Sequence, residues 1–312
     1  MFENTTNNSL IIFGITFIVL IIANIFVMFK SNKELKDRIK SWWIILGTLF
    51  FFLFSNNTLL TIFFAFISYL SLKEYFSHLD IRISDRRIVF WAYISILFQY
   101  YFIHIEWYSM FLIFIPVYSF LFLSFRQILI GETKGFIKNT AAIHWGLMLF
   151  VFAFSHLAYL ATFNEIYFTN DGNFLNIVGI ELILYLILVT QGNDVMQYIS
   201  GKTFGKHKIL PKVSPNKTVE GFIGGMIGTI GLAILLSFLT PFTIIESIFA
   251  GLIISIGGFV GDVVISAIKR DIGIKDFGNL LPGHGGINDR IDSLIYTAPL
   301  FFHYINYLYK LA

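Results

Sequence analysis

The sequence predicts an all-α fold, a polytopic integral membrane helical bundle with about ten hydrophobic helices and a polar site that faces the cytoplasm. Hydrophobic residues make up 56% of the 312 residues and charged residues only 13%, whereas a soluble domain carries about 25% charged residues. The mean hydropathy is +0.75, yet a soluble protein needs a polar shell. The composition therefore excludes a soluble enzyme, a disordered chain and a fibrous repeat.

The chain contains no cysteine, which excludes disulfides, thiolate metal sites and cysteine nucleophiles. The segment Met1–Ser9 has no Lys or Arg, so it lacks the basic start of a secretory signal. We therefore expect the first apolar run to be retained as a membrane span.

Apolar stretches that approach the roughly 20 residues needed to cross a bilayer recur along the chain. They cover residues 10–29, 88–105, 107–125, 141–162, 174–198, 219–239, 244–268 and 290–309, and we expect all eight to cross. Two shorter runs, Trp42–Phe54 and Leu59–Leu72, flank the polar turn 55–58. The pattern leaves open whether these two form tilted spans or one re-entrant hairpin.

Basic residues mark one side of the predicted bundle. Every Lys and Arg except Lys310 falls in alternate loops, namely 30–40, 73–87, 126–138, 202–217 and 269–290. Cytoplasmic loops carry an excess of Lys and Arg, so these five loops are predicted to be cytoplasmic and both termini to lie outside. The re-entrant alternative gives the same orientation.

Three aspartates in the second half are candidate metal ligands. Asp262 lies inside an apolar helix, where an unpaired charge is costly, and Ser266 and Lys269 follow on the same helix face. Asp289 and Asp292 share a face at the start of the last helix. Three carboxylates beside substrate phosphates would suit Mg²⁺. The simpler alternatives are an Asp262–Lys269 contact and acidic capping of the helix by Asp289.

A glycine-rich loop at residues 271–286 separates these aspartates. Its glycines, including Gly285 and Gly286, permit a nest of backbone N–H groups that binds anions. Four basic residues lie in this loop or next to it in the sequence, namely Lys269, Arg270, Lys275 and Arg290. Their positive charges favour a polyphosphate ligand.

A second cationic loop follows Asp194, at the end of the 174–198 stretch. Its five lysines are also typical of a surface that attracts anionic lipid headgroups. The stretch Ser214-Pro215-Asn216-Lys217-Thr218 at a helix start is more specific than such a surface. We therefore treat Asp194, Ser214, Lys217 and Thr218 as candidate ligand-binding residues.

Together these motifs resemble the phosphatidate cytidylyltransferase (CDP-diacylglycerol synthase) family. The resemblance rests on residues read in order as Ser266, Lys269-Arg270, Lys275-Asp276, Pro282-Gly283-His284-Gly285-Gly286 and Asp289-Arg290-x-Asp292, with a second block at 212–221. It covers residues 175–312 well. We divide the chain into variable transmembrane helices at 1–140 and a catalytic transmembrane region at 141–312. One departure is Gln197, which stands where the family has a small residue.

The resemblance implies transfer of CMP from CTP to phosphatidic acid, which yields CDP-diacylglycerol and pyrophosphate. It implies Mg²⁺, allows a second cation such as K⁺, and leads us to expect a homodimer in the bacterial cytoplasmic membrane with its active site facing the cytoplasm. Asp262 and Asp289 would bind Mg²⁺ with support from Asp292. The other implied catalytic residues are Lys269, Arg270 and Lys275, and the implied substrate-binding residues are Asp194, Ser214, Lys217, Thr218, Ser266, His284, Gly285, Gly286 and Arg290.

Two alternatives remain open at this point. Intramembrane Asp and Lys residues also occur along the ion path of a transporter or channel. A related CTP-dependent enzyme would act on another lipid phosphate or on a prenol. The sequence contains no nucleic-acid-binding module.

Overall fold

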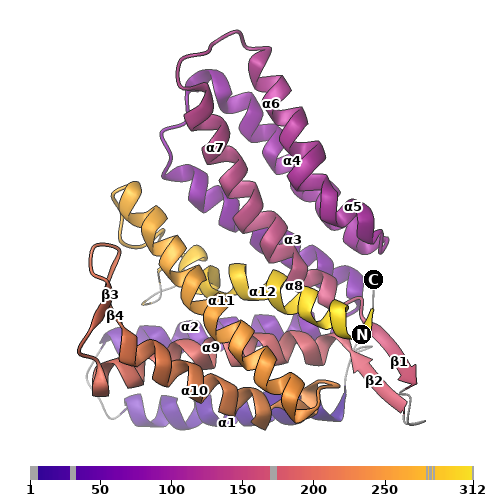
Figure 1. Cartoon of the computed structure of the whole chain (residues 1–312), viewed down its shortest axis with the longest axis vertical. Helices are drawn as coiled ribbons and strands as arrows, with labels where there is room; N and C mark the ends of the chain where they lie inside the picture. The colour runs from indigo at the N-terminus through magenta and orange to yellow at the C-terminus, as the bar shows by residue number, and fades with distance from the viewer. Residues whose placement is uncertain are drawn as a thin grey trace.

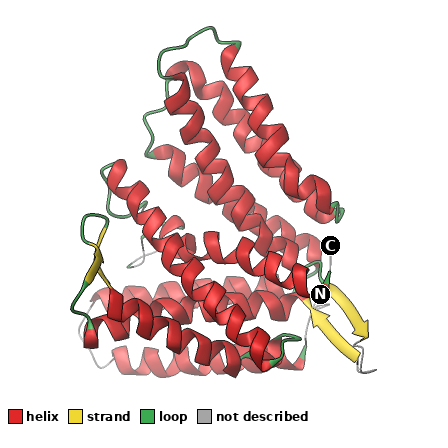
Figure 2. Ribbon diagram, viewed as in Figure 1, coloured by secondary structure: helices red, strands yellow, loops and turns green. Residues whose placement is uncertain are grey.

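The computed structural model describes residues 6–28, 33–168, 174–278, 280, 283 and 285–310, and it is 80% helical. Figures 1 and 2 show a bundle of long helices with two small β-hairpins. The first half of the chain contributes α1 (Asn7–Met28), α2 (Lys33–Leu53), α3 (Asn57–Ser77), α4 (Arg86–His104), α5 (Tyr108–Ile113), α6 (Phe120–Ile128), α7 (Phe136–Gly146) and α8 (Phe154–Leu160). The second half contributes α9 (Gly179–Phe204), α10 (Val219–Leu235), α11 (Ile244–Asp271) and α12 (Asn288–Tyr309).

Two pairs of these helices run on through π-helical turns, Phe114–Ser119 between α5 and α6 and Leu147–Ala153 between α7 and α8. Counting each pair as one gives ten long helices among the described residues. Six are long and apolar enough to cross a membrane, namely Asn7–Val27, Asn57–Ser77, Tyr108–Ile128, Phe136–Leu160, Gly179–Phe204 and Ile244–Asp271. The predicted all-α, polytopic membrane fold is confirmed.

Some predicted boundaries differ from the structure. Helices form at 88–105 and 290–309, as α4 and α12, but neither is among the six that meet the length and hydropathy criteria. The run at 219–239 yields the shorter helix α10. The predicted helix at 174–198 begins only at Gly179, because residues 174–178 form strand β2, which pairs with β1 (Asn164–Phe168) in an antiparallel hairpin.

The segment 42–72, for which the sequence did not decide between two tilted spans and a re-entrant hairpin, belongs to two long helices. These are α2 and α3, each of 21 residues. At 1.5 Å per residue each is about 30 Å long, but only α3 is among the six helices that are also apolar enough to cross a membrane. α2 begins nine residues before the apolar run does, so its first turns are polar. The Asn56 side chain accepts a hydrogen bond from the Leu59 N–H and caps the start of α3.

The two ends of the described chain lie on the same side of the bundle. The Thr6 hydroxyl donates to Glu181 at the start of α9 at 2.5 Å, and the Tyr309 hydroxyl donates to the Pro241 carbonyl just before α11 at 3.1 Å. The hairpin of β3 (Lys208–Leu210) and β4 (Ser214–Thr218) lies at the opposite ends of the helices (Figure 1). This arrangement agrees with the sidedness predicted from the basic loops; which side is cytoplasmic stays a prediction.

Glycines allow the helices of the second half to pack with their backbones close together. A Cβ at Gly225 on α10 would lie 2.2 Å from Gln197 Cγ on α9, and a Cβ at Gly261 on α11 would lie 2.6 Å from the Asp292 carbonyl oxygen on α12. Any side chain at either position would therefore push the helices apart. The close crossing of α11 and α12 brings Asp262 next to Asp292.

Candidate active site

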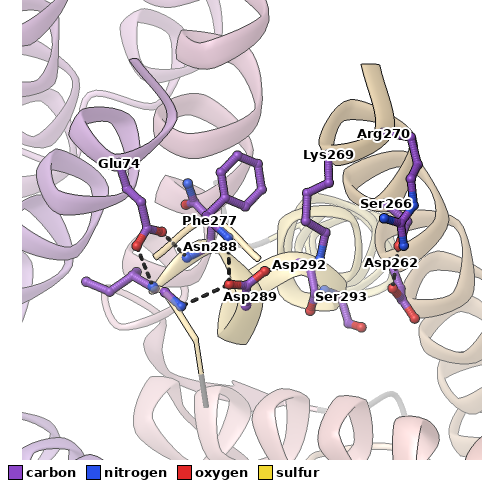
Figure 3. Close-up of polar contacts among 12 residues, drawn as sticks. Glu74, Asp262, Ser266, Lys269, Arg270, Phe277, Asn288, Asp289, Asp292 and Ser293 are labelled. Atoms are coloured by element: carbon purple, nitrogen blue, oxygen red, sulfur yellow. Dashed lines mark hydrogen bonds and ion pairs between the residues drawn. The ribbon is translucent and has the colours of Figure 1, made fainter. Parts of the chain in front are cut away.

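Three carboxylates gather where α9, α11 and α12 meet. Asp194 on α9 accepts hydrogen bonds from the Ser293 hydroxyl at 3.0 and 3.1 Å. Asp292 interacts electrostatically with both Asp194 and Asp262. Asp262 also accepts a hydrogen bond from the Ser266 hydroxyl at 3.3 Å, one turn further along α11 (Figure 3). Three acids in this arrangement need positive charge beside them.

Lys217 supplies one of these positive charges. Its Nζ lies 2.7 Å from Asp262 Oδ2 and donates to Gln197 Oε1 at 3.0 Å. The residue is the last but one of β4, and Thr218 then caps α10 by accepting the Gly221 N–H at 3.1 Å. The β3–β4 hairpin therefore ends in a capped helix that fixes the Lys217 backbone beside α9 and α11.

Gln197, the one departure from the family signature, occupies a central place in this arrangement. Its amide group donates to Asn193 Oδ1 at 3.0 Å, while its oxygen accepts from Lys217. Asn193 Oδ1 in turn accepts the hydroxyls of Thr229 and Ser255, each at 3.0 Å. A buried polar network therefore orients Gln197, and through it Lys217.

Asp289 holds the glycine-rich loop against the start of α12. Its Oδ2 accepts the backbone N–H of Phe277 at 3.0 Å and of Gly286 at 2.9 Å, while its Oδ1 lies 3.1 Å from Lys269 Nζ. Only 5% of the Asp289 side chain is exposed. Lys269 also interacts electrostatically with Asp292, so it lies between two of the predicted metal ligands, as Figure 3 shows.

Glu74, near the end of α3, is a site residue that sequence reasoning missed. Its carboxylate accepts the backbone N–H of Ile287 at 3.2 Å and of Asn288 at 2.8 Å (Figure 3). Two neighbours strengthen the contact, because Ser71 bonds to the Asn288 side chain and His78 to the Phe277 carbonyl. The only sequence signal was an acid in the last turn of an apolar run, which also fits a solvated helix end.

The two carboxylates Glu74 and Asp289 explain why glycines stand in this loop. A Cβ at Gly286 would lie 2.1 Å from Glu74 Oε1, and one at Gly285 would lie 2.7 Å from Asp289 Oδ2. Gly285 also has a φ of +82°, which side-chain-bearing residues rarely adopt. The loop therefore folds around two acids, with its backbone N–H groups turned toward them.

The remaining predicted site residues lie around this centre. Arg270 and Lys275 are exposed, and Arg270 donates to the Val213 carbonyl at 3.4 Å. Ser214 is half-buried in β4. The Nε of Arg290 is buried without a hydrogen-bond partner among the described residues, and the guanidinium interacts electrostatically with Asp194. His284 lies outside the described residues.

The predicted metal ligands fall into two groups, each linked by ion pairs and electrostatic interactions. Asp262 belongs to the group of Asp194, Asp292 and Lys217, and Asp289 to the loop group with Lys269 and Glu74. Within the described part of the chain, no three acids or histidines are already grouped as metal ligands. Coordination of one ion by Asp262 and Asp289 stays a prediction.

Comparisons with known proteins place this geometry in context. The sequence model described as "Cytidylyltransferase family" matches residues 36–308. A protein of Escherichia coli (strain K12), described as uncharacterized protein YnbB, is 44% identical over 280 residues, which are 89% of each chain. The phosphatidate cytidylyltransferase of Staphylococcus haemolyticus (strain JCSC1435) is 47% identical over 124 residues, and that of Staphylococcus aureus (strain COL) is 44% identical over the same length. These 124 residues are 39% of this chain and 48% of either relative, so the match spans about half the length of each.

Proposed function

This chain belongs to the cytidylyltransferase family, and we propose that it transfers CMP from CTP to phosphatidic acid in a Mg²⁺-dependent reaction that yields CDP-diacylglycerol and pyrophosphate. One observation carries the proposal. Three interacting carboxylates, Asp194, Asp262 and Asp292, and two paired lysines, Lys217 and Lys269, meet beside a glycine-rich loop. With a divalent cation bound to its carboxylates, such a site can bring polyanions together and neutralise them.

The reaction needs positioning more than it needs a protein nucleophile. A phosphate oxygen of the lipid attacks the α-phosphorus of CTP, the bond to the β-phosphate oxygen breaks, and pyrophosphate leaves with that electron pair. The attacking oxygen is already anionic, so no strong base is required. Oriented binding and fixed positive charge lower the barrier of such transfers. Lys217, Lys269, Arg270, Lys275 and Arg290 would supply this charge.

The donor set fits Mg²⁺, which prefers carboxylate and phosphate oxygens. Asp262 Oδ2 and Asp289 Oδ1 each face a lysine ammonium, so each position already favours a cation. Asp292 interacts with Asp262 and with Lys269, the partner of Asp289. We propose that Asp262, Asp289 and Asp292 hold Mg²⁺ together with phosphate oxygens of CTP. The bound ion would stabilise charge on the α-phosphate and on the leaving group.

Substrate binding would divide between the two cationic segments. Ser214, Lys217, Thr218 and Asp194 would line one side of the phosphates, and Ser266, Gly285 and Gly286 the other, with His284 in the same loop. Both segments lie at one end of α9 and α11 rather than at mid-bundle. This position favours the enzyme over a transporter, whose ion path would have to continue through the bundle.

A direct assay tests the proposal. Purified protein would be incubated with CTP labelled in its α-phosphate, Mg²⁺ and a panel of phosphatidic acid, other lipid phosphates and a prenol. We expect label in CDP-diacylglycerol with stoichiometric release of pyrophosphate, and loss of both with a chelator. Labelled product only from another acceptor would favour the related enzyme, and no product from any acceptor would contradict the proposal. The mass of the purified protein–detergent complex would check the proposed homodimer.

A further inference from the structure

A large apolar cavity lies beside the proposed active site. Its volume is about 680 Å³, within the range of about 300–1,000 Å³ for ligand pockets. Side chains of α1, α2, α3, α8, α9 and α12 line it, and nearly all of them are hydrocarbon. A cavity of this composition excludes CTP as its occupant, because it would leave the nucleotide's polar groups unpaired.

Part of the cavity wall comes from residues next to the site carboxylates in the sequence, and three polar side chains belong to the lining, those of Arg38, Gln191 and Arg290. Arg290 and Ile291 line it from the first turn of α12, between Asp289 and Asp292, and Gln191 lines it from α9, one turn before Asp194. Arg38 lines it from the first two turns of α2. The cavity lining therefore reaches the helix turns that carry Asp194, Asp289 and Asp292.

Arg290 supplies an independent sign of an anionic ligand at this junction. Its Nε is buried and has no hydrogen-bond partner in the described part of the chain. A buried donor without a partner is costly, and a guanidinium is suited to bidentate binding of a phosphate. An anion between the cavity and the carboxylates would satisfy this donor.

We propose that this cavity binds an acyl chain of the lipid phosphate acceptor, with Arg290 and Arg38 attracting its phosphate. The inference rests on the proposed function and adds the place of the lipid tail. It also gives a role to α1, which lies before the segment matched by the family model and supplies cavity residues such as Leu20 and Ala23. Each CH₂ group buried in such a cavity adds to the affinity, so the chain length of the acceptor would govern how tightly it binds.

Photolabelling tests the position of the tail without any need for turnover. A phosphatidic acid with a diazirine in its acyl chain would be irradiated with the purified full-length protein, and the labelled peptides identified by mass spectrometry. We expect label on α1 and α2 residues of the cavity, removed by excess phosphatidic acid but not by phosphatidylcholine. Equal competition by both lipids would indicate a structural lipid, and label confined to outward-facing residues would leave no tail in the cavity; either result would overturn the inference.

Matched tryptophan variants provide the second readout. Ala23→Trp and Leu46→Trp fill the cavity, whereas Ile22→Trp and Ile44→Trp place the same ring on exposed positions of the same helices that do not line it. We expect the first pair to lower by about tenfold the ratio of kcat/KM for a dipalmitoyl acceptor to that for a dihexanoyl acceptor, and the second pair to leave this ratio unchanged. An unchanged ratio in both pairs would contradict the inference. If no acceptor were turned over, the proposed function would fail, while the photolabelling would still decide where the tail binds.

Discussion

The carboxylate of Glu74, in the last turn of α3, accepts the backbone N–H of Asn288 at 2.8 Å and so ties the start of α12 to the first half of the chain. The same carboxylate accepts the Ile287 N–H. Asp289 follows immediately, and its own contacts fix the loop at Phe277 and Gly286. A helix from residues 1–140 therefore helps to shape the site, although the family signature lies in the second half.

Glu74→Gln is expected to lower both activity and stability. The amide can still accept one backbone N–H, but its NH₂ group would face the other, and a buried group left unsatisfied costs about 1–3 kcal/mol. We expect a lower thermal midpoint in detergent and a higher KM for CTP, because the loop loses its anchor. Asp80→Asn, an exposed acid in the loop after α3, is the matched control. Parent-like values for both variants would show that the Glu74 contact does not hold the loop.

Gln197→Ala is expected to impair turnover while leaving the fold intact. Lys217 would keep Asp262 but lose the amide oxygen that orients its Nζ, and a lost hydrogen bond to a charged group is worth about 1.5–3 kcal/mol. We expect kcat/KM to fall by about tenfold or more. Val195→Ala, at an exposed position of α9, should leave kcat/KM unchanged. A Gln197→Ala enzyme with parent kinetics would mean that Lys217 needs no support from α9.

Sequence patterns predicted the membrane fold because hydrophobicity and basic loops reflect the bilayer directly. Short-range spacing also identified Asp262, Ser266 and Lys269 as one helix face, and Asp262 does contact Ser266. The ion pairs were not predictable in this way. Asp262 pairs with Lys217 rather than with Lys269, and Lys269 pairs with Asp289. In each pair the two partners come from different elements, so the packing of these elements determines which lysine lies beside which aspartate.

The role of Glu74 could not be predicted from the sequence for the same reason. It acts on residues more than 200 positions away, and no local pattern records that contact. The glycines of the loop were predicted to bind anions through backbone N–H groups. The structure adds that Gly285 and Gly286 also make room for the protein's own carboxylates.

Lys275→Ala is expected to raise the KM for CTP without loss of stability. Lys275 is exposed and lies in the glycine-rich loop, so its ammonium is available to a phosphate and contributes little to packing. Lys212→Ala removes an exposed charge between β3 and β4 and controls for general attraction of anions. Equal KM values for the two variants across a salt titration would indicate only a surface-charge effect, which ionic strength screens.

The predicted topology can be tested with reporters. We expect fusions after Lys206 and after Lys275 to report the cytoplasm and a fusion after Lys310 to report the outside, because the basic loops lie on the first side and the end of α12 on the other. An activity reporter and a glycosylation or thiol-labelling reporter would be read at each position. Translocation of the loop after Lys275 would place the proposed site away from cytoplasmic CTP.

Asp262→Asn and Asp289→Asn are expected to have similar effects on activity but different effects on stability. Asp262→Asn breaks a pair with Lys217 in which the two side chains are 25% and 18% exposed. Such a partly buried pair contributes more than the roughly 0–1 kcal/mol of a surface pair, so the thermal midpoint should fall moderately. Asp289→Asn removes the charge facing the buried Lys269, and breaking a buried pair costs about 3–5 kcal/mol. The second variant should therefore unfold at a clearly lower temperature than the first.

Activity measurements on the double variant then decide whether the two carboxylates serve one ion. If Mg²⁺ binds to both, each single variant should lose most activity and the double variant should be hardly worse, because ligands that act as a unit are strongly non-additive. Raised Mg²⁺ should partly restore each single variant, since the remaining carboxylates still bind the ion more weakly. Kinetics would be measured below the midpoint of the less stable variant, so that unfolding does not enter. Losses that multiply in the double variant, with no response to Mg²⁺ in Asp289→Asn, would show instead that Asp289 only anchors the glycine loop and that the metal is held by the group around Asp262.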